Sequence, residues 1–428
     1  MPRASTLVTA SLSAAVLVQS AGAVVIVFVH DQSSDQIIRC VDRNGDGDAT
    51  DPGEATDFLD ATLPVDTGIN NAQGLVALGP NDILATDNFA PDNVVHGRDL
   101  NGDGDSLDPG EAFVWFDGTL PGGFHLTNPA ELRARANGGY FILDNNTLDT
   151  INPEAIYALA DADNSGVIEP SEVTLAFLLS PAGASLTTTF DVVEDNAGLL
   201  YALDITDPNQ IESIDQLDPV SGTKHEWFDS VDLLNFTGYV LSFTVNELEY
   251  ISSSDEVIFG ASTLGGSSVI LAATDRNHSG FIDASSEFRL LWSATLSADH
   301  PSTGSPRDFW LAADGSLFFT DALHDVVWRL IDRNGDGDYN DLHETVMFYD
   351  TAGAGASGLP TLSLPLSVTT WMCAADLAEP FGVLDLADVQ AFIAAFIGQQ
   401  PLADLNADGV WDLADVQGYI AAFIGGCP

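Results

Sequence analysis

Basic side chains are scarce in this sequence. Its 428 residues include 12 lysines and arginines against 64 aspartates and glutamates, which gives a formal net charge of -52. A surface this acidic repels nucleic acid and anionic lipid, because both are bound through Lys and Arg side chains that neutralise phosphate. We therefore exclude nucleic acid as a partner and expect cations as ligands. The hydrophobic fraction of 45% is ample for a packed core.

Long hydrophobic runs are missing as well, since no stretch reaches the ~20 apolar residues of a membrane span. The longest weakly apolar run, from Leu7 to Val18, precedes the small residues Ala21-Gly22-Ala23. We interpret residues 1–23 as a secretory signal peptide that is cleaved after Ala23. The alternative is a short hydrophobic start to the fold, because Val24 to Val29 is itself strand-like. The mature chain is expected to be secreted, and to be extracellular or associated with a cell surface.

Cysteine is almost absent, with three residues in the whole chain. An oxidising compartment permits a disulfide, and Cys373 and Cys427 bracket one short C-terminal segment, so these two are expected to pair. Cys40 is then left over as a small buried residue.

An acidic loop recurs along the chain, and a fixed period of this kind determines architecture. The loop starts at Asp42, Asp99, Asp161, Asp275 and Asp332, at intervals of 57, 62, 114 and 57 residues. Because 114 is twice 57, a degraded copy is expected near residue 218, where Asp218-Pro219-Val220-Ser221-Gly222 stands.

Short β-rich runs flank each acidic loop. In the second copy they are Leu75 to Leu78, Asp82 to Thr86, Val94 to Arg98 and Ala112 to Phe116. In the sixth they are Phe309 to Ala312, Ser316 to Thr320, Val326 to Ile331 and Thr345 to Tyr349. Four strands per repeat and six repeats predict an all-β fold, a six-bladed β-propeller over residues 24–370, with the acidic loop joining the third strand to the fourth.

The two ends of this domain are expected to share a blade. After removal of the signal peptide, the first blade lacks its innermost strand, and Leu362, Leu364, Leu366 and Val368 alternate directly after the sixth blade. These residues predict a C-terminal strand that completes the N-terminal blade. Pro365 fits only if that strand is an edge, because proline has no N–H to donate. The alternative is an extended linker.

The acidic loops resemble EF-hand calcium loops. Calcium takes 6 to 8 oxygen ligands, which an EF-hand loop supplies from alternate positions around a glycine at position six. The third loop matches this scheme with the ligands Asp161, Asp163, Ser165, Val167 and Glu172.

The remaining loops match the same scheme at the front and more loosely at the back. The first, second and sixth have one extra residue, so that Asp51, Asp108 and Asp341 are expected to replace or supplement the closing glutamate. The expected ligands are Asp42, Asn44, Asp46, Asp48, Asp51 and Glu54; Asp99, Asn101, Asp103, Asp105, Asp108 and Glu111; Asp275, Asn277, Ser279, Phe281 and Glu287; and Asp332, Asn334, Asp336, Asp338, Asp341 and Glu344.

A single loop of this kind could be a solvated turn, because Asp, Asn and Gly favour turns. Five copies in register favour calcium. Since strands flank these loops where helices flank an EF-hand, the expected role of calcium is structural rather than a switch between helix orientations.

Residues 371–428 contain a second, shorter repeat. Asp385 to Gln390 returns as Asp412 to Gln417 after 27 residues, and an apolar helix follows each copy. Each helix has one apolar face, and the two helices could pack together through these faces. The faces consist of Leu386, Val389, Phe392, Ile393 and Phe396 in the first helix, and of Leu413, Val416, Tyr419, Ile420 and Phe423 in the second.

This segment resembles a dockerin, in the variety that ends in Gly-Cys and caps secreted bacterial proteins. The second loop carries the family pattern in Asp404, Asn406, Asp408, Val410, Asp412 and Asp415. The first loop departs from the pattern, because Ala378 and Pro380 stand where ligands are required. The resemblance implies docking to a cohesin-like or other surface receptor, with Leu386, Ala387, Leu413 and Ala414 as contacts. The alternative is a purely structural helical hairpin.

No sequence motif identifies catalysis. The eight histidines show no metal-ligand spacing, and no nucleophilic serine, phosphate loop or zinc motif occurs. His125, His300 and His324 lie in loops expected on the upper face, the one opposite the acidic loops, and are the best candidates for chemistry.

An acidic residue closes the second strand in five blades, with Gly260 in the other, which resembles NHL and gluconolactonase-like propellers. These residues are Asp31, Asp87, Asp144, Asp204 and Asp321. They could surround a ligand or metal at the channel mouth, or cap turns, and we favour capping.

Three functions remain open. The first is a calcium-stiffened recognition or scaffold domain with a glycan or protein ligand at its upper face, presented through its dockerin-like tail. The second is a polysaccharide-active or lactonase-like hydrolase carried by that tail, and the third is a purely structural surface-layer protein. We favour the first, because no catalytic motif occurs, and the fold by itself cannot decide.

Overall fold

The computed structural model describes residues 24–44, 46–63, 67–88, 92–118, 126–135, 138–145, 154–180, 189–204, 212–241, 247–378, 381–399, 403, 405 and 410–426. The expected signal peptide lies outside the described residues. Among the residues described, no helix is long and apolar enough to cross a membrane.

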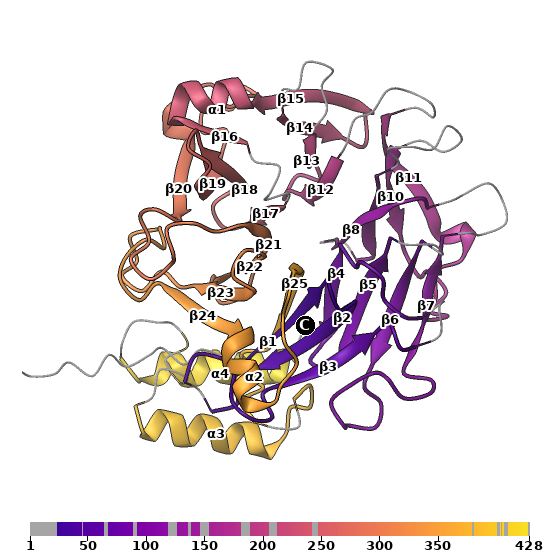
Figure 1. Cartoon of the computed structure of the whole chain (residues 1–428), viewed down its shortest axis with the longest axis vertical. Helices are drawn as coiled ribbons and strands as arrows, with labels where there is room; N and C mark the ends of the chain where they lie inside the picture. Colours follow the sequence, from indigo (N-terminus) through magenta and orange to yellow (C-terminus); the bar gives the residue numbers. More distant parts are fainter. Residues whose placement is uncertain are drawn as a thin grey trace, which may run out of the picture.

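Six antiparallel sheets stand around one central axis (Figure 1). From the axis outward, blade one contains β25 (Pro365–Met372), β1 (Val25–Asp31), β2 (Gln36–Val41) and β3 (Ala55–Asp60); blade two β4 (Leu75–Gly79), β5 (Asp82–Asp87), β6 (Asn93–Arg98) and β7 (Ala112–Asp117); and blade three β8 (Pro129–Ala134), β9 (Tyr140–Asp144), β10 (Glu154–Leu159) and β11 (Val173–Ser180). Blade four contains β12 (Thr189–Glu194), β13 (Leu200–Asp204), β14 (Ser213–Asp218) and β15 (Thr223–Asp229); blade five β17 (Leu248–Ile251), β18 (Glu256–Thr263), β19 (Ser268–Ala273) and β20 (Phe288–Ser293); and blade six β21 (Pro306–Leu311), β22 (Leu317–Asp321), β23 (Val326–Leu330) and β24 (Thr345–Asp350).

The first strands of the six blades form the inner ring. Each contacts the first strand of the next blade, in the order β25, β4, β8, β12, β17, β21 and back to β25. The protein is therefore a six-bladed β-propeller, as the repeat predicts. Apolar residues on both faces of each blade fill the space between neighbours, for example Val27 of β1 against Phe318 and Phe348 of blade six.

The C-terminal strand closes the ring. β25 pairs antiparallel with β1, placing Val27 opposite Thr370 and Asp31 opposite Pro365. Pro365 lies on the edge strand of its sheet, so its lack of an N–H leaves no gap in the ladder. The strand begins three residues later than the alternation suggests and continues to Met372, two residues beyond the predicted domain end.

Three elements depart from the simple repeat. Helix α1 (Ser230–Thr237) follows blade four and is capped by the Asp229 side chain, and α2 (Thr351–Ser357) follows blade six, capped by Asp350. Strand β16 (Tyr239–Leu241) pairs with the far end of β18 and adds a fifth strand to blade five. β18 therefore continues past Gly260 to Thr263.

Two helices follow the propeller, α3 (Leu386–Ile397) and α4 (Leu413–Gly425), at the lower edge of Figure 1. β25 ends on the face of the ring that carries the connections between third and fourth strands, so the helices lie on that face. The core of blades one and two continues into them through Trp371, Leu377 and Phe392. Cys373 is disulfide-bonded and Cys40 is a free, buried thiol; Cys427 lies outside the described residues.

Asp31 ties the segment before β25 to blade one. Its Oδ1 accepts the backbone N–H groups of Ser363 and Leu364 at 3.2 and 2.6 Å. We expect Asp31→Ala to lower the free energy of unfolding by about 3 kcal/mol, because two N–H groups lose a charged acceptor. Asp31→Asn keeps one acceptor oxygen and should cost less. Chemical denaturation measures both, and a wild-type value for Asp31→Ala would contradict this role.

Candidate functional site

All five acidic loops share one turn geometry. The side chain of the first aspartate accepts the backbone N–H of the glycine at position six, whose φ lies between +85° and +104°. The pairs are Asp42–Gly47 at 2.9 Å, Asp99–Gly104 at 2.9 Å, Asp161–Gly166 at 2.9 Å, Asp275–Gly280 at 2.7 Å and Asp332–Gly337 at 2.9 Å. Only glycine adopts this φ without strain, which explains its presence at position six.

Oxygen atoms converge in these loops. In the third loop, one carboxylate oxygen each from Asp161, Asp163 and Glu172 lies within 4.8 Å of the others. The Ser165 hydroxyl lies 3.0 Å from the Val167 carbonyl, so positions five and seven face the same point. Asp103, Asp105 and Glu111 converge equally in the second loop, and Ser279 and Phe281 do so in the fifth. Such oxygen sets fit a calcium ion.

In the three loops with an extra residue, the aspartate three residues before the closing glutamate takes part in the hydrogen bonds inside the loop. The Asn44 amide donates to Asp46 and Asp51 at 3.0 and 2.6 Å. Asn101 makes the same bonds to Asp103 and Asp108, and Asn334 to Asp336 and Asp341. Asp51 and its counterparts therefore face the loop interior, and their role as supplementary ligands stays a prediction.

The closing glutamates hold the loops in shape. Glu54 accepts the N–H groups of Arg43, Asn44 and Asp51, and Glu111, Glu172 and Glu344 bond in the same way. Glu287 differs, since its Oε1 is buried and has no hydrogen-bond partner while Oε2 accepts from Asp283 and Ala284. An unpaired buried carboxylate oxygen is costly, so this atom favours a cation in the fifth loop.

Each acidic loop also fastens its blade to the preceding one. The N–H of the eighth loop residue, which is buried, donates to a carbonyl on the fourth strand of that preceding blade. The bonds run from Ala49 to Phe348 at 2.8 Å, Ser106 to Phe58 at 2.8 Å, Ile168 to Trp115 at 2.8 Å, Ile282 to Trp227 at 3.0 Å and Tyr339 to Leu291 at 2.8 Å. We call these five bonds the blade clasps.

The clasp acceptors lie at β-bulges. Phe58, Trp115, Trp227, Leu291 and Phe348 are each skipped in the pairing of their strand with its neighbour. A bulge leaves one residue out of the ladder and frees its carbonyl for another donor. The clasps were not predicted from the sequence, although the eighth loop residue is apolar or aromatic in four of the five loops.

Blade four has no acidic loop, as the degraded copy predicts. Asp218 closes a short turn between β14 and β15 by accepting from Val220 and Ser221. The outer strand of blade three, β11, accordingly lacks the covering loop. Leu175 and Leu178 on this strand are exposed.

In the C-terminal segment, two aspartates organise the loops before the helices. Asp388 accepts from Leu377, Ala378 and Asp385, and Asp415 accepts from Leu405 and Asp412. Asp376 bonds the N–H of Gly382, which occupies the left-handed region as in the propeller loops. Burial, and the nearby Asp388 carboxylate, raise the pKa of Asp376 to about 6. Of the second-loop residues, Asp404, Asn406 and Asp408 lie outside the described residues.

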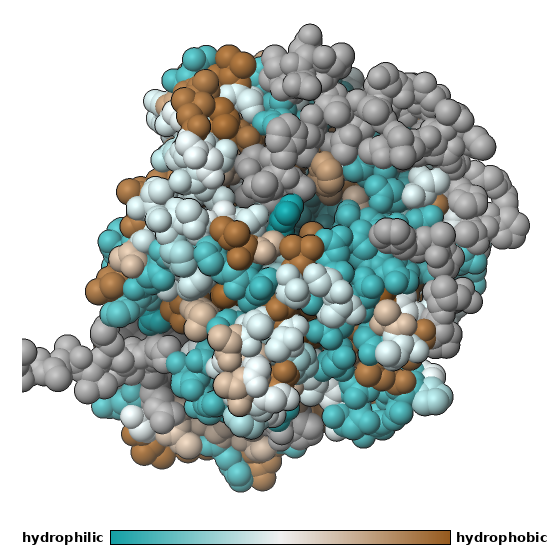
Figure 2. Space-filling model, in the orientation of Figure 1, coloured by the Kyte–Doolittle hydropathy of each residue, from teal (hydrophilic) through white to brown (hydrophobic). Residues whose placement is uncertain are grey.

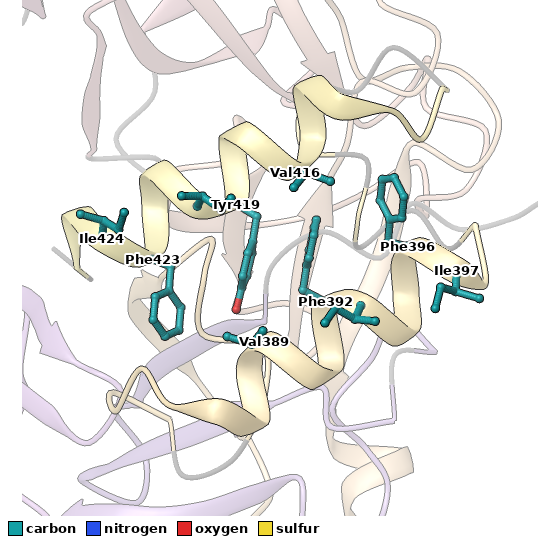
Figure 3. A pocket seen from close by; sticks show the side chains of 10 residues that line it. Val389, Phe392, Phe396, Ile397, Val416, Tyr419, Phe423 and Ile424 are labelled. Carbon is teal, nitrogen blue, oxygen red and sulfur yellow. The ribbon is translucent and has the colours of Figure 1, made fainter.

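Helices α3 and α4 form an open apolar groove (Figure 3). The Phe392 and Tyr419 rings stack at its floor, 4.1 Å apart and nearly parallel. The cavity has a volume of about 430 Å³, and every residue of one wall is related to one of the other by 27 positions. Its lining consists of Val389, Phe392, Ile393, Phe396, Ile397, Val416, Tyr419, Ile420, Phe423 and Ile424.

The prediction that the two helical faces pack together is therefore only half right. Phe392 and Tyr419 are buried, but Ile393 and Ile420 are each 49% exposed. The two rings fill the space between the helices at the floor, and the isoleucines stay exposed. Leu386 and Leu413 are exposed at the first turns, with Ala387 half-buried and Ala414 exposed. Figure 2 shows hydrophobic atoms at the lower edge of the molecule near α3, and also at the upper left near α1.

Three of the five aspartates that close the second strands are buried caps. Asp31 bonds the backbone before β25 as described above, and Asp144 accepts from Thr127 and Asn128 at 3.0 and 2.9 Å. Asp321 accepts from Ser305 and Leu323. Capping, which the sequence favoured over a ligand ring, thus accounts for these three.

Asp321 also brings together two of the three histidines singled out from the sequence. His324 Nδ1 lies 2.6 Å and His300 Nε2 3.4 Å from Asp321 Oδ2. The His300 ring is buried against Trp292 and Trp328. Contacts with His300 and His324, together with the backbone N–H groups of Ser305 and Leu323, outweigh burial and hold the pKa of Asp321 down at about 2. His125 lies outside the described residues.

A buried charge cluster that sequence analysis missed fills the central channel. Glu131, Asp191 and Asp308 each stand two residues after the start of an innermost strand, and Glu247 directly precedes β17. All four are buried. An acidic residue at the same place in three innermost strands was the available indication. Burial raises the pKa of Glu131, Glu247 and Asp308 well above the usual range, and neighbouring carboxylates add to the effect.

Arg133 lies one layer deeper, because alternate residues of a strand face the same side. Its guanidinium bonds Asp191 and Glu247 at 2.8 and 2.7 Å, and Glu249 at 2.8 Å. The same group lies over the Trp310 ring, 5.1 Å from its centroid. Arg133 therefore plugs the channel below the acidic residues.

Comparisons with known proteins define no family for this chain. No family model matches, and no curated protein is similar. Solved structures with related folds include a chain of a nidogen–laminin complex (12% identity, TM-score 0.47, covering 81% of this chain and 98% of that one). Virginiamycin B lyase from Staphylococcus aureus (12%, 0.38, 72% and 76%) and a protein of unknown function from Bacteroides caccae (8%, 0.45, 82% and 99%) are others. Similarities this low carry no argument about function.

The low pKa of Asp321 predicts a contribution to acid stability. Its folded pKa of about 2 lies below the unfolded value, so the contribution is complete above pH ~4 and is lost as the pH falls towards 2. Asp321→Asn keeps an acceptor but no charge. We expect it to lower the free energy of unfolding by about 2 kcal/mol at pH 7. The difference from wild type should vanish in denaturation series near pH 2; a constant difference would contradict the assignment.

Proposed function

We propose that this protein is a secreted, calcium-stabilised recognition or scaffold propeller that attaches to a cell-surface or extracellular partner through its C-terminal helix pair. The observation that carries the proposal is the exposed groove between α3 and α4, which is apolar and duplicated in an otherwise acidic chain. Apolar surface of this kind is characteristic of protein-binding sites.

The proposed calcium ions act at the blade interfaces. Each acidic loop carries both the oxygen ligands and, at its eighth residue, the N–H of a blade clasp. An ion that fixes the loop therefore fixes the clasp. Such a role agrees with the loops' strand flanks, and the dockerin-like pattern of Val410, Asp412 and Asp415 supports a further ion beside α4.

Calcium removal tests the proposed calcium ions in the acidic loops. With affinities of roughly 10⁻⁴ to 10⁻³ M, five sites at ~1 mM calcium stabilise the fold by about 2 to 7 kcal/mol. We expect excess chelator to lower the melting temperature and to speed amide hydrogen exchange at the five clasp residues. The turn at Asp218, which has no loop, serves as the internal control. An unchanged melting curve would refute the calcium sites.

The groove favours a partner with an apolar ridge flanked by Lys and Arg. Residues 371–428 contain eight acidic residues and no Lys, Arg or His. Opposite charge around an apolar centre aids both encounter and specificity. A second copy of this chain is a poorer occupant, because its acidic rim would repel.

A pair of peptides tests docking with the full chain. An amphipathic helix with a leucine ridge and lysine flanks should bind, and its glutamate-flanked counterpart should not. We expect Ile393→Glu with Ile420→Glu to weaken binding at least about tenfold, because each places a charge in the groove. Leu264→Glu, at an exposed propeller turn, is the matched control. Leu386→Ala with Leu413→Ala separates the groove from the contacts that the dockerin resemblance implies. Equal binding by the groove variant and wild type, or dimerisation without the peptide, would count against this partner.

A hydrolase, polysaccharide-active or lactonase-like, is the second candidate. The contact of Asp321 with His324, whose side chain is 28% exposed, is the observation in its favour, since an aspartate can orient a histidine as a general base. A substrate panel with calcium, comparing wild type with His324→Gln, tests it: activity that the variant loses would support the hydrolase.

A further inference from the structure

A cavity lies between blades four and five, on the face that carries the acidic loops. Its volume is about 150 Å³, and a single water needs only ~10 to 15 Å³ of such volume, so there is room for a group of several heavy atoms. Its lining consists of Tyr201, Gln216 and Trp227 from blade four, and of Tyr250, Asp255, Val257, Asp275 and His278 from blade five.

Three aromatic side chains shape this cavity. Trp227 and Tyr201 are 3% and 8% exposed, and their rings meet edge to face with centroids 4.7 Å apart. Gln216 donates to the Tyr201 hydroxyl at 2.7 Å, and the Tyr250 hydroxyl donates to Asp255 Oδ1 at 2.6 Å. Both phenol groups are thus hydrogen-bonded within the protein. The cavity therefore offers a ligand chiefly its ring surfaces and the exposed carboxylate of Asp255.

The ring position of Tyr201 carries an arginine in two other blades. Tyr201, Phe141 and Phe318 are each the second residue of the second strand in their blade. The Arg135 guanidinium lies 4.2 Å from the centroid of the Phe141 ring, and the Arg329 guanidinium lies 5.3 Å from that of Phe318. Among the residues described, no arginine or lysine lies over Tyr201.

A comparison of blade six with blade four shows which side chain has been exchanged. Arg329 stands opposite Phe318 in the strand pairing, and Gln216 stands opposite Tyr201 in the same way. In both blades the second-strand ring meets the ring of the clasp residue in the fourth strand edge to face. Arg329 also pairs with Asp314 at 2.7 Å. Because glutamine is shorter and neutral, blade four lacks the cation that covers the ring in blade six, and the cavity lies beside Gln216.

We propose that this cavity binds a guanidinium group, from an arginine side chain of a partner or from a small molecule, in the place that the Arg329 guanidinium takes in blade six. A guanidinium stacks on aromatic faces, and this attraction grows when the site is shielded from water. Asp255 is the charged partner at the cavity, since Asp275 is an expected ligand of the fifth acidic loop. The strongly acidic chain favours the approach of any cation.

Two probes of nearly equal shape test the requirement for charge. The n-butylguanidinium cation and the neutral n-butylurea are titrated with the full chain in calcium at physiological ionic strength, and binding is followed by ligand-observed NMR. We expect the neutral probe to bind at least about tenfold more weakly, because it loses the attraction of a cation to the rings and to Asp255. Equal binding of the two probes would overturn the proposal.

Peptides distinguish the two sources of the guanidinium group. Gly-Gly-Arg-Gly-Gly is compared with the same peptide carrying citrulline, whose side chain is neutral. Stronger binding of the arginine peptide indicates a protein side chain as the natural ligand. Binding of n-butylguanidinium without binding of either peptide indicates a small molecule.

Gln216→Arg is the decisive variant, because it supplies the guanidinium from the chain itself and keeps every ring of the cavity. We expect it to weaken binding of n-butylguanidinium at least about tenfold. Val220→Arg, in a turn of the same blade where Val220 is 96% exposed, is the matched control for the added charge and should bind like wild type. Tyr250→Leu removes one ring and should repeat the loss if Gln216→Arg folds poorly.

Undiminished binding by both Gln216→Arg and Tyr250→Leu would place the cation elsewhere on the acidic surface and overturn the proposal. This result would leave the proposed loop calcium and the helix groove intact, because neither uses Gln216 or Tyr250.

Discussion

Closure of the ring is the constraint on which the rest of this structure depends. Six blades bring six innermost strands to one axis, and the last of these strands comes from the C-terminal end of the propeller to pair with β1. Any side chain that faces the axis is thereby forced against its counterparts from the other blades. The channel cluster around Arg133 and the cap at Asp31 both follow from this geometry.

Part of the acidic charge lies where the blades meet. The outer loops carry carboxylates to every interface except that between blades three and four, and in the same loops the eighth residue donates a backbone hydrogen bond to the preceding blade. A propeller holds its blades together by packing between neighbours, so a bond that crosses each interface adds stability where the sheets themselves cannot. One of the few arginines, Arg133, lies buried in the channel, where it pairs with three carboxylates.

The two faces of the ring carry different structural features. β25 directs the chain to the face with the acidic loops, where α3 and α4 share the core of blades one and two. Their groove is exposed because the Phe392 and Tyr419 rings already fill the space between the helices. The opposite face holds the buried aspartate caps, the histidines around Asp321 and the buried channel carboxylates.

Local repetition was enough to predict the blades, the closing strand, the acidic loops and the helix pair, because turn residues and alternating apolar residues act within a few positions of one another. It also indicated which blade lacks a loop. The clasps and the channel cluster were not predictable in this way. Their members, such as Ser106 with Phe58 or Arg133 with Glu247, lie far apart in the chain and meet only when the ring closes. The groove, too, was decided by tertiary packing, because helical periodicity identifies an apolar face but not how much of it a neighbour covers.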